Sequence, residues 1–144
     1  MQIEINFVNM TNSHGTFATT INCMDGRALA ATHAWLKTNY AVDYIDSITE
    51  PGMDAWIQNV SGEGRAWLKR KIEISTKGHG SRIITVVAHD ECAGNPVTPN
   101  IHAEDIKKAI SVIHSITHEL ELSDVVIIPL WVYQKDGAWI AERV

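Results

Sequence analysis

The two cysteines of the chain each lie beside other groups that bind metals or carry charge. The first opens the segment Cys23-Met24-Asp25-Gly26-Arg27, and the second closes the segment His89-Asp90-Glu91-Cys92. Two thiolates and one imidazole are ligands that zinc accepts, and a catalytic zinc ion keeps a fourth position for water or substrate. The spacing therefore indicates a metal centre with Cys23, His89 and Cys92 as its ligands.

An aspartate and an arginine follow the first cysteine at alternate positions. If this segment is extended, Cys23, Asp25 and Arg27 point to the same side, and the guanidinium can hold the carboxylate with two hydrogen bonds. A structural zinc site requires no such pair, so the pattern favours a working site. Two other interpretations stay open: Asp25 as the permanent fourth ligand of a structural zinc, or Asp25 and Arg27 as a structural ion pair.

The bulk properties exclude several classes of function. A net charge of −5 argues against a nucleic-acid partner, because neutralising phosphates requires clustered lysines and arginines. No stretch approaches the roughly 20 apolar residues of a membrane span, and the N-terminus has no signal-peptide pattern. We therefore expect a cytoplasmic protein, in which paired cysteines bind metal more often than they form disulfides. A Cys23–Cys92 disulfide is the alternative, and it would leave His89 unexplained.

The hydrophobic pattern predicts strands that alternate with helices. Expected strands are 2–7, 16–22, 42–48, 82–88 and 125–132, and a turn at Asp136-Gly137 leads to a further strand at 138–140. Expected helices are 28–40, 53–60, 63–77 and 101–120. The fold class that follows is α/β, with a mainly parallel central sheet, flanking helices and a C-terminal β-hairpin extension.

Both metal-binding segments follow predicted strands. The segment at Cys23 comes directly after strand 16–22, and the segment at His89 comes directly after strand 82–88. In open parallel sheets, ligands bind beyond the carboxyl ends of the strands, where the strand order reverses. We expect the two segments to meet there, within one domain that spans residues 1–144.

The five residues taken together resemble the signature of β-class carbonic anhydrases. The run His89-Asp90-Glu91-Cys92-Ala93-Gly94-Asn95-Pro96 is similar to a small branch of putative carbonic anhydrases, and the likeness covers about residues 16–132. The resemblance implies a sheet order 2-1-3-4, counted from strand 16–22. It also implies zinc (Zn2+) held by Cys23, His89 and Cys92, with Asp25 and Arg27 as the catalytic pair.

The function implied by the resemblance is that of a zinc lyase. It is the reversible hydration of carbon dioxide to bicarbonate by zinc-bound hydroxide, in a homodimer or a higher homo-oligomer. Two alternatives remain at this point. The same zinc site could hydrolyse carbonyl sulfide or carbon disulfide, or the protein could be a non-catalytic, zinc-stabilised binding protein.

Overall fold

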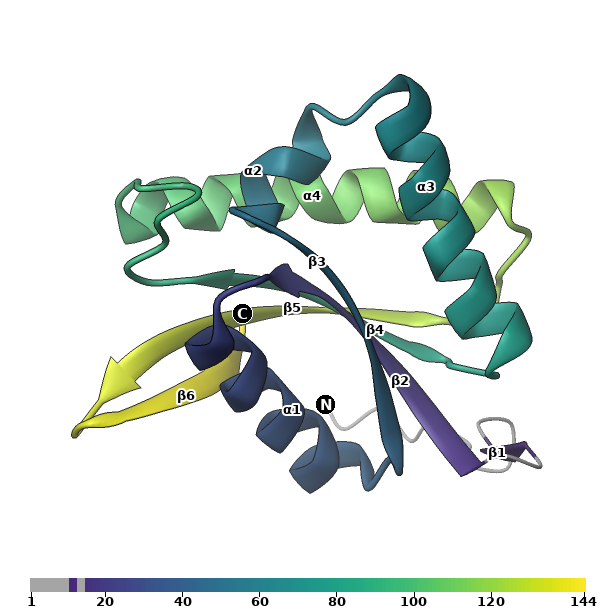
Figure 1. The fold of residues 1–144 in the computed structure, drawn as a ribbon, viewed down its shortest axis with the longest axis horizontal. Coiled ribbons are helices and arrows are strands. Elements are labelled where there is room, and N and C mark those ends of the chain that lie inside the picture. Colours follow the sequence, from purple (N-terminus) through teal and green to yellow (C-terminus); the bar gives the residue numbers. More distant parts are fainter. Residues whose placement is uncertain (1–10, 13–14) are drawn as a thin grey trace.

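The structure is a computed structural model that describes residues 11–12 and 15–144. The strand expected at residues 2–7 lies outside these residues. The elements between β2 and β6 follow the expected alternation of strands and helices (Figure 1). The α/β class and the C-terminal hairpin are therefore confirmed.

The central sheet is mainly parallel. Its main strands are β2 (Gly15–Cys23), β3 (Tyr44–Glu50), β4 (Ile83–His89), β5 (Val126–Lys135) and β6 (Ala138–Arg143). β2 pairs in parallel with both β3 and β4, and β4 pairs in parallel with β5. The order β3-β2-β4-β5 is the expected order 2-1-3-4. β6 extends it as the antiparallel partner of β5, and the short β1 (Thr11–Asn12) pairs antiparallel with β2.

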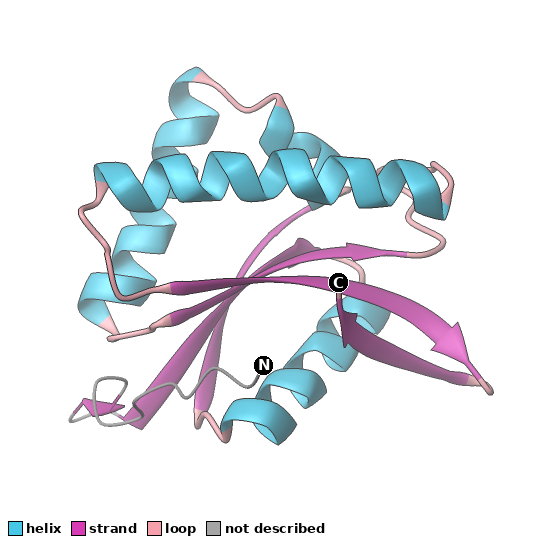
Figure 2. Ribbon diagram, turned by 180° about the vertical axis from the view of Figure 1, so that it is seen from behind, coloured by secondary structure: helices cyan, strands magenta, loops and turns pink. Residues whose placement is uncertain are grey.

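Helices cover both faces of the sheet (Figures 1 and 2). One face carries α1 (Gly26–Tyr40). The other carries α2 (Met53–Gln58), α3 (Gly62–Glu73) and the long α4 (Pro99–Glu119). This arrangement explains the sequence of β4, which is apolar throughout except for Thr85 and His89, because a strand covered on both faces has no side that faces water.

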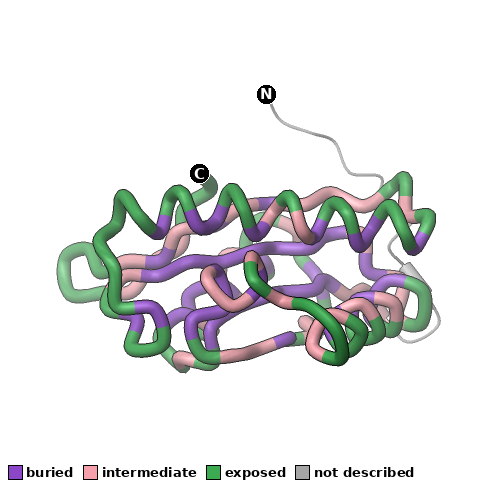
Figure 3. The backbone as a smooth tube through the Cα atoms, turned by 90° about the horizontal axis from the view of Figure 1, so that it is seen from above, coloured by how far each residue is buried: buried purple, intermediate pink, exposed green. Residues whose placement is uncertain are grey.

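The hydrophobic core is divided between the two faces of the sheet. The larger cluster lies under α2, α3 and α4 and includes Ile21, Val86 and Ile113; the smaller lies under α1 and includes Leu36 and Ile128. Seen from above, α4 alternates between buried and exposed residues along its length (Figure 3). Burial of this apolar stripe fixes the helix against the sheet.

The helix expected at residues 63–77 is divided in the structure. α3 ends at Glu73, and the chain continues through one π-helical turn, Ile74–Gly78. The hydroxyl of Thr76, which is buried here, donates to the carbonyl oxygen of Ile72. Within the described residues, no helix combines the length and the apolarity that crossing a bilayer would require.

Candidate metal centre

The register of the parallel strands brings the two metal-binding segments together. Ile21 of β2 lies opposite Val86 of β4, so two residues further on Cys23 reaches the level of the residue before His89. Both strands end at this edge of the sheet. A tight turn follows β4, and in it Glu91 has the left-handed conformation, with φ of 56°. This turn returns Cys92 to the side on which Cys23 and His89 lie.

Cys23, His89 and Cys92 form a buried cluster of three donor groups. Their candidate ligand atoms all lie within 4.8 Å of one another, and the two Sγ atoms are 3.9 Å apart. Both cysteines are free thiols, so the disulfide interpretation is wrong. The three residues that the sequence selected are those that the fold brings together.

The histidine of the cluster is oriented as a metal ligand would be. The Nδ1 atom of His89 donates to the backbone carbonyl of Asp90 at 2.7 Å. This leaves the lone pair on Nε2, which is buried and has no hydrogen-bond partner among the described residues. A buried polar atom without a partner costs free energy, and a metal ion would satisfy it. The donor set and this orphaned nitrogen both fit zinc.

The two thiols differ in acidity. Burial by itself would raise the pKa of Cys23, but the adjacent His89 ring and the backbone N–H groups of Asp25 and Gly52 favour the thiolate and lower this pKa to about 7. Burial and the neighbouring Cys23 raise the pKa of Cys92 to about 11. A second thiolate is therefore unfavourable without a cation between the two sulfurs, and a divalent metal would relieve that repulsion.

Asp25 and Arg27 pair as expected, but their segment is not extended. The strand ends at Cys23, Asp25 caps the N-terminus of α1 by accepting from the backbone N–H of Arg27 at 2.8 Å, and Arg27 lies in the first helical turn. The pairing comes from this cap geometry instead of strand alternation. The guanidinium donates to Asp25 through Nε at 3.1 Å and through Nη2 at 2.7 Å.

Arg27 also changes the electrostatics of Asp25. Its hydrogen bonds, more than any other contact, lower the pKa of Asp25 to about 2, so the carboxylate is ionised at neutral pH. Asp25 is not part of the three-residue cluster. The structure therefore shows a carboxylate that is beside the cluster and held by a guanidinium.

A buried polar network supports the second cysteine. Asn95, three residues after Cys92, donates through Nδ2 to Asp105 at 2.9 Å and to Asp54 at 3.2 Å. The other oxygen of Asp54 accepts from the Nδ1 of His102 at 2.6 Å. These residues are all at least nine-tenths buried, and they join α2, α4 and the loop after Cys92. The loop that carries the second thiol is thus anchored from inside the protein.

Two glycines allow the neighbouring loops to touch. A Cβ atom on Gly94 would lie 2.5 Å from the backbone nitrogen of Gly52 and 2.6 Å from the backbone carbon of Pro51. The close approach places Gly52 so that its N–H faces Cys23, while the N–H groups of Gly94 and Asn95 face Cys92. Both sulfurs therefore receive backbone donors from loops that pack without side chains between them.

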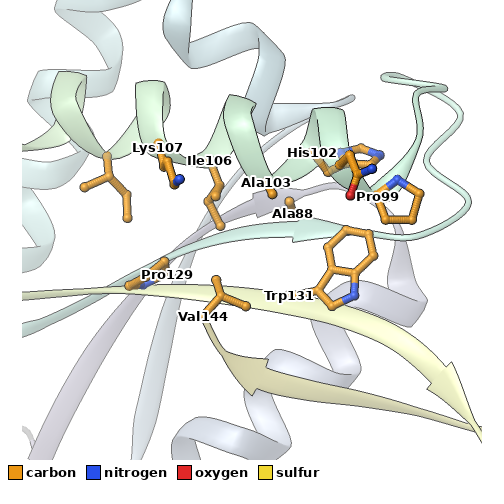
Figure 4. Close-up of a pocket in the computed structure, with 11 residues that line it drawn as sticks. Ala88, Pro99, His102, Ala103, Ile106, Lys107, Pro129, Trp131 and Val144 are labelled. Carbon is orange, nitrogen blue, oxygen red and sulfur yellow. The ribbon is translucent and has the colours of Figure 1, made fainter.

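An apolar cavity lies elsewhere, between α4 and β5 (Figure 4). It has a volume of about 410 Å³, and Ala88, His102, Ile106 and Trp131 are among the residues that line it. None of the three cluster residues lines this cavity. Its size does not make it the candidate site, because the titratable donors with perturbed pKa values gather at the strand ends.

The buried network of Asp54, Asn95, His102 and Asp105 was not predicted from the sequence. His102 and Asp105 lie four residues before Ile106 and Ala109, so they belong to the same buried stripe of α4. Polar residues on a buried stripe require hydrogen-bond partners, and this requirement was the only sign of the network in the sequence. Their partners Asp54 and Asn95 lie 48 and 10 residues away respectively from His102 and Asp105, and no local pattern connects them.

Comparison with known proteins bears on this site. A family model described as putative carbonic anhydrase matches residues 13–143 of the chain. No curated protein matches.

Three solved structures are similar to this chain in fold. The carbonic anhydrase of Streptococcus mutans is 18% identical with a TM-score of 0.49, and the match covers 88% of this chain and 80% of that one. The β-carbonic anhydrase CafA of Aspergillus fumigatus is 13% identical with a TM-score of 0.48, covering 88% and 74%. β-Carbonic anhydrase isoform I of Trichomonas vaginalis is 13% identical with a TM-score of 0.45, covering 86% and 80%.

Proposed function

The chain belongs to the putative carbonic anhydrase family, and we propose that it catalyses the zinc-dependent, reversible hydration of carbon dioxide to bicarbonate and a proton. The observation that carries this proposal is the buried cluster of Cys23, His89 and Cys92, in which the Nε2 of His89 has no hydrogen-bond partner within the described part of the chain. Beside the cluster lies a carboxylate that Arg27 holds. A purely structural site would use that carboxylate as a ligand.

The residues divide into those that hold the ion and those that act beside it. Cys23, His89 and Cys92 would hold zinc as two thiolates and a neutral imidazole. When bound, the ion would supply a Lewis acid that lowers the pKa of a coordinated water, from about 15.7 in bulk to about 7 in favourable sites. Two thiolates donate more charge than imidazoles do, so this site needs help from its neighbours to acidify water.

Asp25 is placed to give that help. Its carboxylate stays ionised because Arg27 lowers its pKa to about 2, so it is a hydrogen-bond acceptor at every physiological pH. An acceptor beside the nucleophilic water orients a lone pair toward the carbon of carbon dioxide. Arg27 has a second role, which is to keep Asp25 from becoming a fourth ligand.

Two substitutions test the proposal. Cys92→Ser should remove zinc and hydration activity together, because the hydroxyl is a poor replacement for a thiolate ligand. Asp25→Ala should keep zinc at one equivalent and lower kcat by about 10²-fold, the lower range for loss of a positioned acid–base group. Metal content and stopped-flow carbon dioxide hydration, measured on the same sample, give both results.

A matched control is Asp124→Ala. Asp124 forms a similar ion pair with an arginine, Arg82, at 2.9 Å, but it lies at the opposite ends of the strands. This variant should keep both zinc and activity. Full hydration activity in a zinc-free Cys92→Ser protein would contradict the proposed mechanism.

The same assays separate the alternative functions. Release of hydrogen sulfide from carbonyl sulfide or carbon disulfide, with no hydration of carbon dioxide, would assign the site to those substrates. Zinc binding without turnover of carbon dioxide, carbonyl sulfide or carbon disulfide would favour a zinc-stabilised binding protein.

We also propose that residues 1–144 act as one domain and assemble into a homodimer or a higher homo-oligomer. Support comes from exposed apolar side chains near the site and on the open edge strand: Met24 directly follows Cys23, and Tyr44 begins β3. Sedimentation of a fully active protein as a monomer would contradict this assembly.

A further inference from the structure

The guanidinium of Arg27 has two partners besides Asp25. Its Nη1 donates to the carboxylate of Glu91 at 3.1 Å, and its Nη2 donates to the backbone carbonyl of the same residue at 3.3 Å. Its Cζ atom lies 4.7 Å from the ring centroid of Trp139, in cation–π geometry. The group is therefore held at its edges by two residues and on one face by a third.

The three partners come from separate parts of the fold. Asp25 precedes α1, Glu91 lies in the turn between the ligands His89 and Cys92, and Trp139 lies in β6 of the C-terminal hairpin. The contact between Arg27 and Trp139 joins the hairpin to the site, and β6 also packs against α1. Only the tertiary fold places these groups around one side chain.

Arg27 needs such restraint to act on Asp25. Its side chain is 43% exposed, and exposed ion pairs hold their geometry weakly because water and salt screen them. An aromatic face and a second set of acceptors fix the plane of the guanidinium, and this pre-orients its two N–H groups toward Asp25. Without them, the long side chain could rotate away.

We propose that Glu91 and Trp139 are positioning residues, which keep Asp25 beside the metal site by fixing the plane of Arg27. A released carboxylate is itself a good zinc ligand, and it would close the fourth position. In the structure, Asp25 lies outside the three-residue cluster and is bonded to Arg27 through both carboxylate oxygens. This inference rests on the proposed metal site and assigns control of its open state to the hairpin.

The test uses cobalt(II) in place of zinc, and azide as a probe of the open position. Azide binding changes the visible d–d spectrum of the cobalt. In the double variant Glu91→Gln, Trp139→Ala, apparent azide affinity should fall about tenfold if Asp25 occupies the fourth position in nine-tenths of the molecules. Trp139→Phe keeps an aromatic face, so it should retain nearly the wild-type affinity.

A third substitution separates positioning from a merely structural role. Adding Asp25→Ala to the double variant should restore azide affinity, because the competing carboxylate is gone while Arg27 stays unrestrained. A general loosening of the site would not be reversed in this way. Trp67→Ala, which removes a tryptophan that is exposed on α3, is the matched control and should leave azide affinity unchanged.

A second measurement works without metal. The Nε–H signal of Arg27 in NMR spectra should exchange slowly with water in the wild-type protein, and faster in Glu91→Gln and in Trp139→Ala measured singly. An unchanged exchange rate would overturn the inference. Two results with azide would also overturn the inference. One is an unchanged azide affinity in the double variant, and the other is a loss of azide affinity that the added Asp25→Ala substitution does not restore.

The outcomes distinguish this inference from the proposed function. Hydration activity with no effect of the double variant on azide would overturn the inference alone. The azide effects without any hydration of carbon dioxide would overturn the function alone. Failure of the wild-type protein to bind cobalt or zinc would overturn both.

Discussion

The two loops that carry the thiols are held in different ways. The loop at Cys23 is fixed by charged groups near the surface, since Asp25, Arg27 and Glu91 all keep contact with water. The loop at Cys92 is fixed from within, because Asn95 is bonded to two buried carboxylates. Surface pairs are weak and screened by salt, whereas a satisfied buried network is costly to disturb.

This difference indicates that the two loops contribute to the site in different ways. We expect the loop at Cys92, which the buried side chain of Asn95 anchors, to keep its sulfur in place, and the loop at Cys23 to yield more easily. The proposed site, which would hold a metal and keep one position open, would need both properties. Substitutions in the two loops should therefore differ in what they damage.

The largest effect is expected where the loop at Cys92 touches the loop that follows β3. Gly94→Ala puts a Cβ atom within 2.6 Å of backbone atoms of Gly52 and Pro51, neither of which can yield without moving a loop. We expect a loss of about 3 kcal/mol in the free energy of unfolding, at the upper end for overpacking. Urea denaturation measures it.

Gly26→Ala is the control for this substitution. A Cβ atom on Gly26 would meet no atom of residues 11–12 or 15–144 within 4 Å, and the residue lies in the first turn of α1. It should be neutral or slightly stabilising, because alanine favours helix. Equal losses in the two variants would show that the contact of Gly94 with Pro51 and Gly52 has no special importance.

A smaller effect is expected from Asn95→Ala. It removes the amide that Asp54 and Asp105 share, leaving buried acceptors without that donor, at a cost of about 2 kcal/mol in unfolding free energy. Because the loop also aims backbone N–H groups at Cys92, zinc affinity should fall about 10- to 100-fold. Competition with a chelator measures the affinity.

The matched control is Asn39→Ala on the exposed side of α1. Its amide donates to the backbone carbonyl of Trp35 at 2.8 Å, so the variant also loses one hydrogen bond, but at the surface. Zinc affinity should be unchanged. If the Asn95 variant binds zinc as tightly as the wild type, the buried network does not support the site.

The smallest effect on stability is expected in the surface loop. Arg27→Gln should raise the pKa of Asp25 from about 2 toward its ordinary 3.8, because the guanidinium is the largest cause of the shift. Because the pKa of Asp25 is lower in the folded state, its ionised carboxylate stabilises the folded protein at pH values above the pKa of the unfolded state. That contribution is lost as pH falls from about 4 toward 2.

NMR titration of the Asp25 carboxyl group measures this shift, and acid unfolding measures its consequence. Arg27→Gln should differ from the wild type at neutral pH and converge with it near pH 2. Thermal stability at neutral pH should change less than in Gly94→Ala or Asn95→Ala. A larger loss than in Asn95→Ala would contradict the division between the two loops.

Much of the fold could be predicted because its signals are local. The all-apolar run in β4 indicates a strand covered on both faces, and the turn at Asp136-Gly137 indicates a hairpin. The π-helical turn that follows Glu73 could not be predicted, because the residue types of Ile74–Gly78 carry no local signal that distinguishes it from a continued α-helix. Element types followed from the sequence better than their ends did.

The sequence by itself determined the chemistry of the site. Cys23, His89 and Cys92 are the right donors for zinc wherever they lie, and their places at the ends of two strands already implied that they would meet. The pairing of Asp25 with Arg27 was expected from an extended segment, and it occurs although the segment is a helix cap, because the two residues are only two positions apart. Donor chemistry and short spacings are properties of the chain.

Only the tertiary structure decided what surrounds those groups. The ring of Trp139 on Arg27 and the hydrogen bonds from Asn95 to Asp54 and Asp105 join residues from different elements. Such contacts depend on how helices and strands pack, and packing is a sum over many distant residues. No short stretch of sequence contains that information.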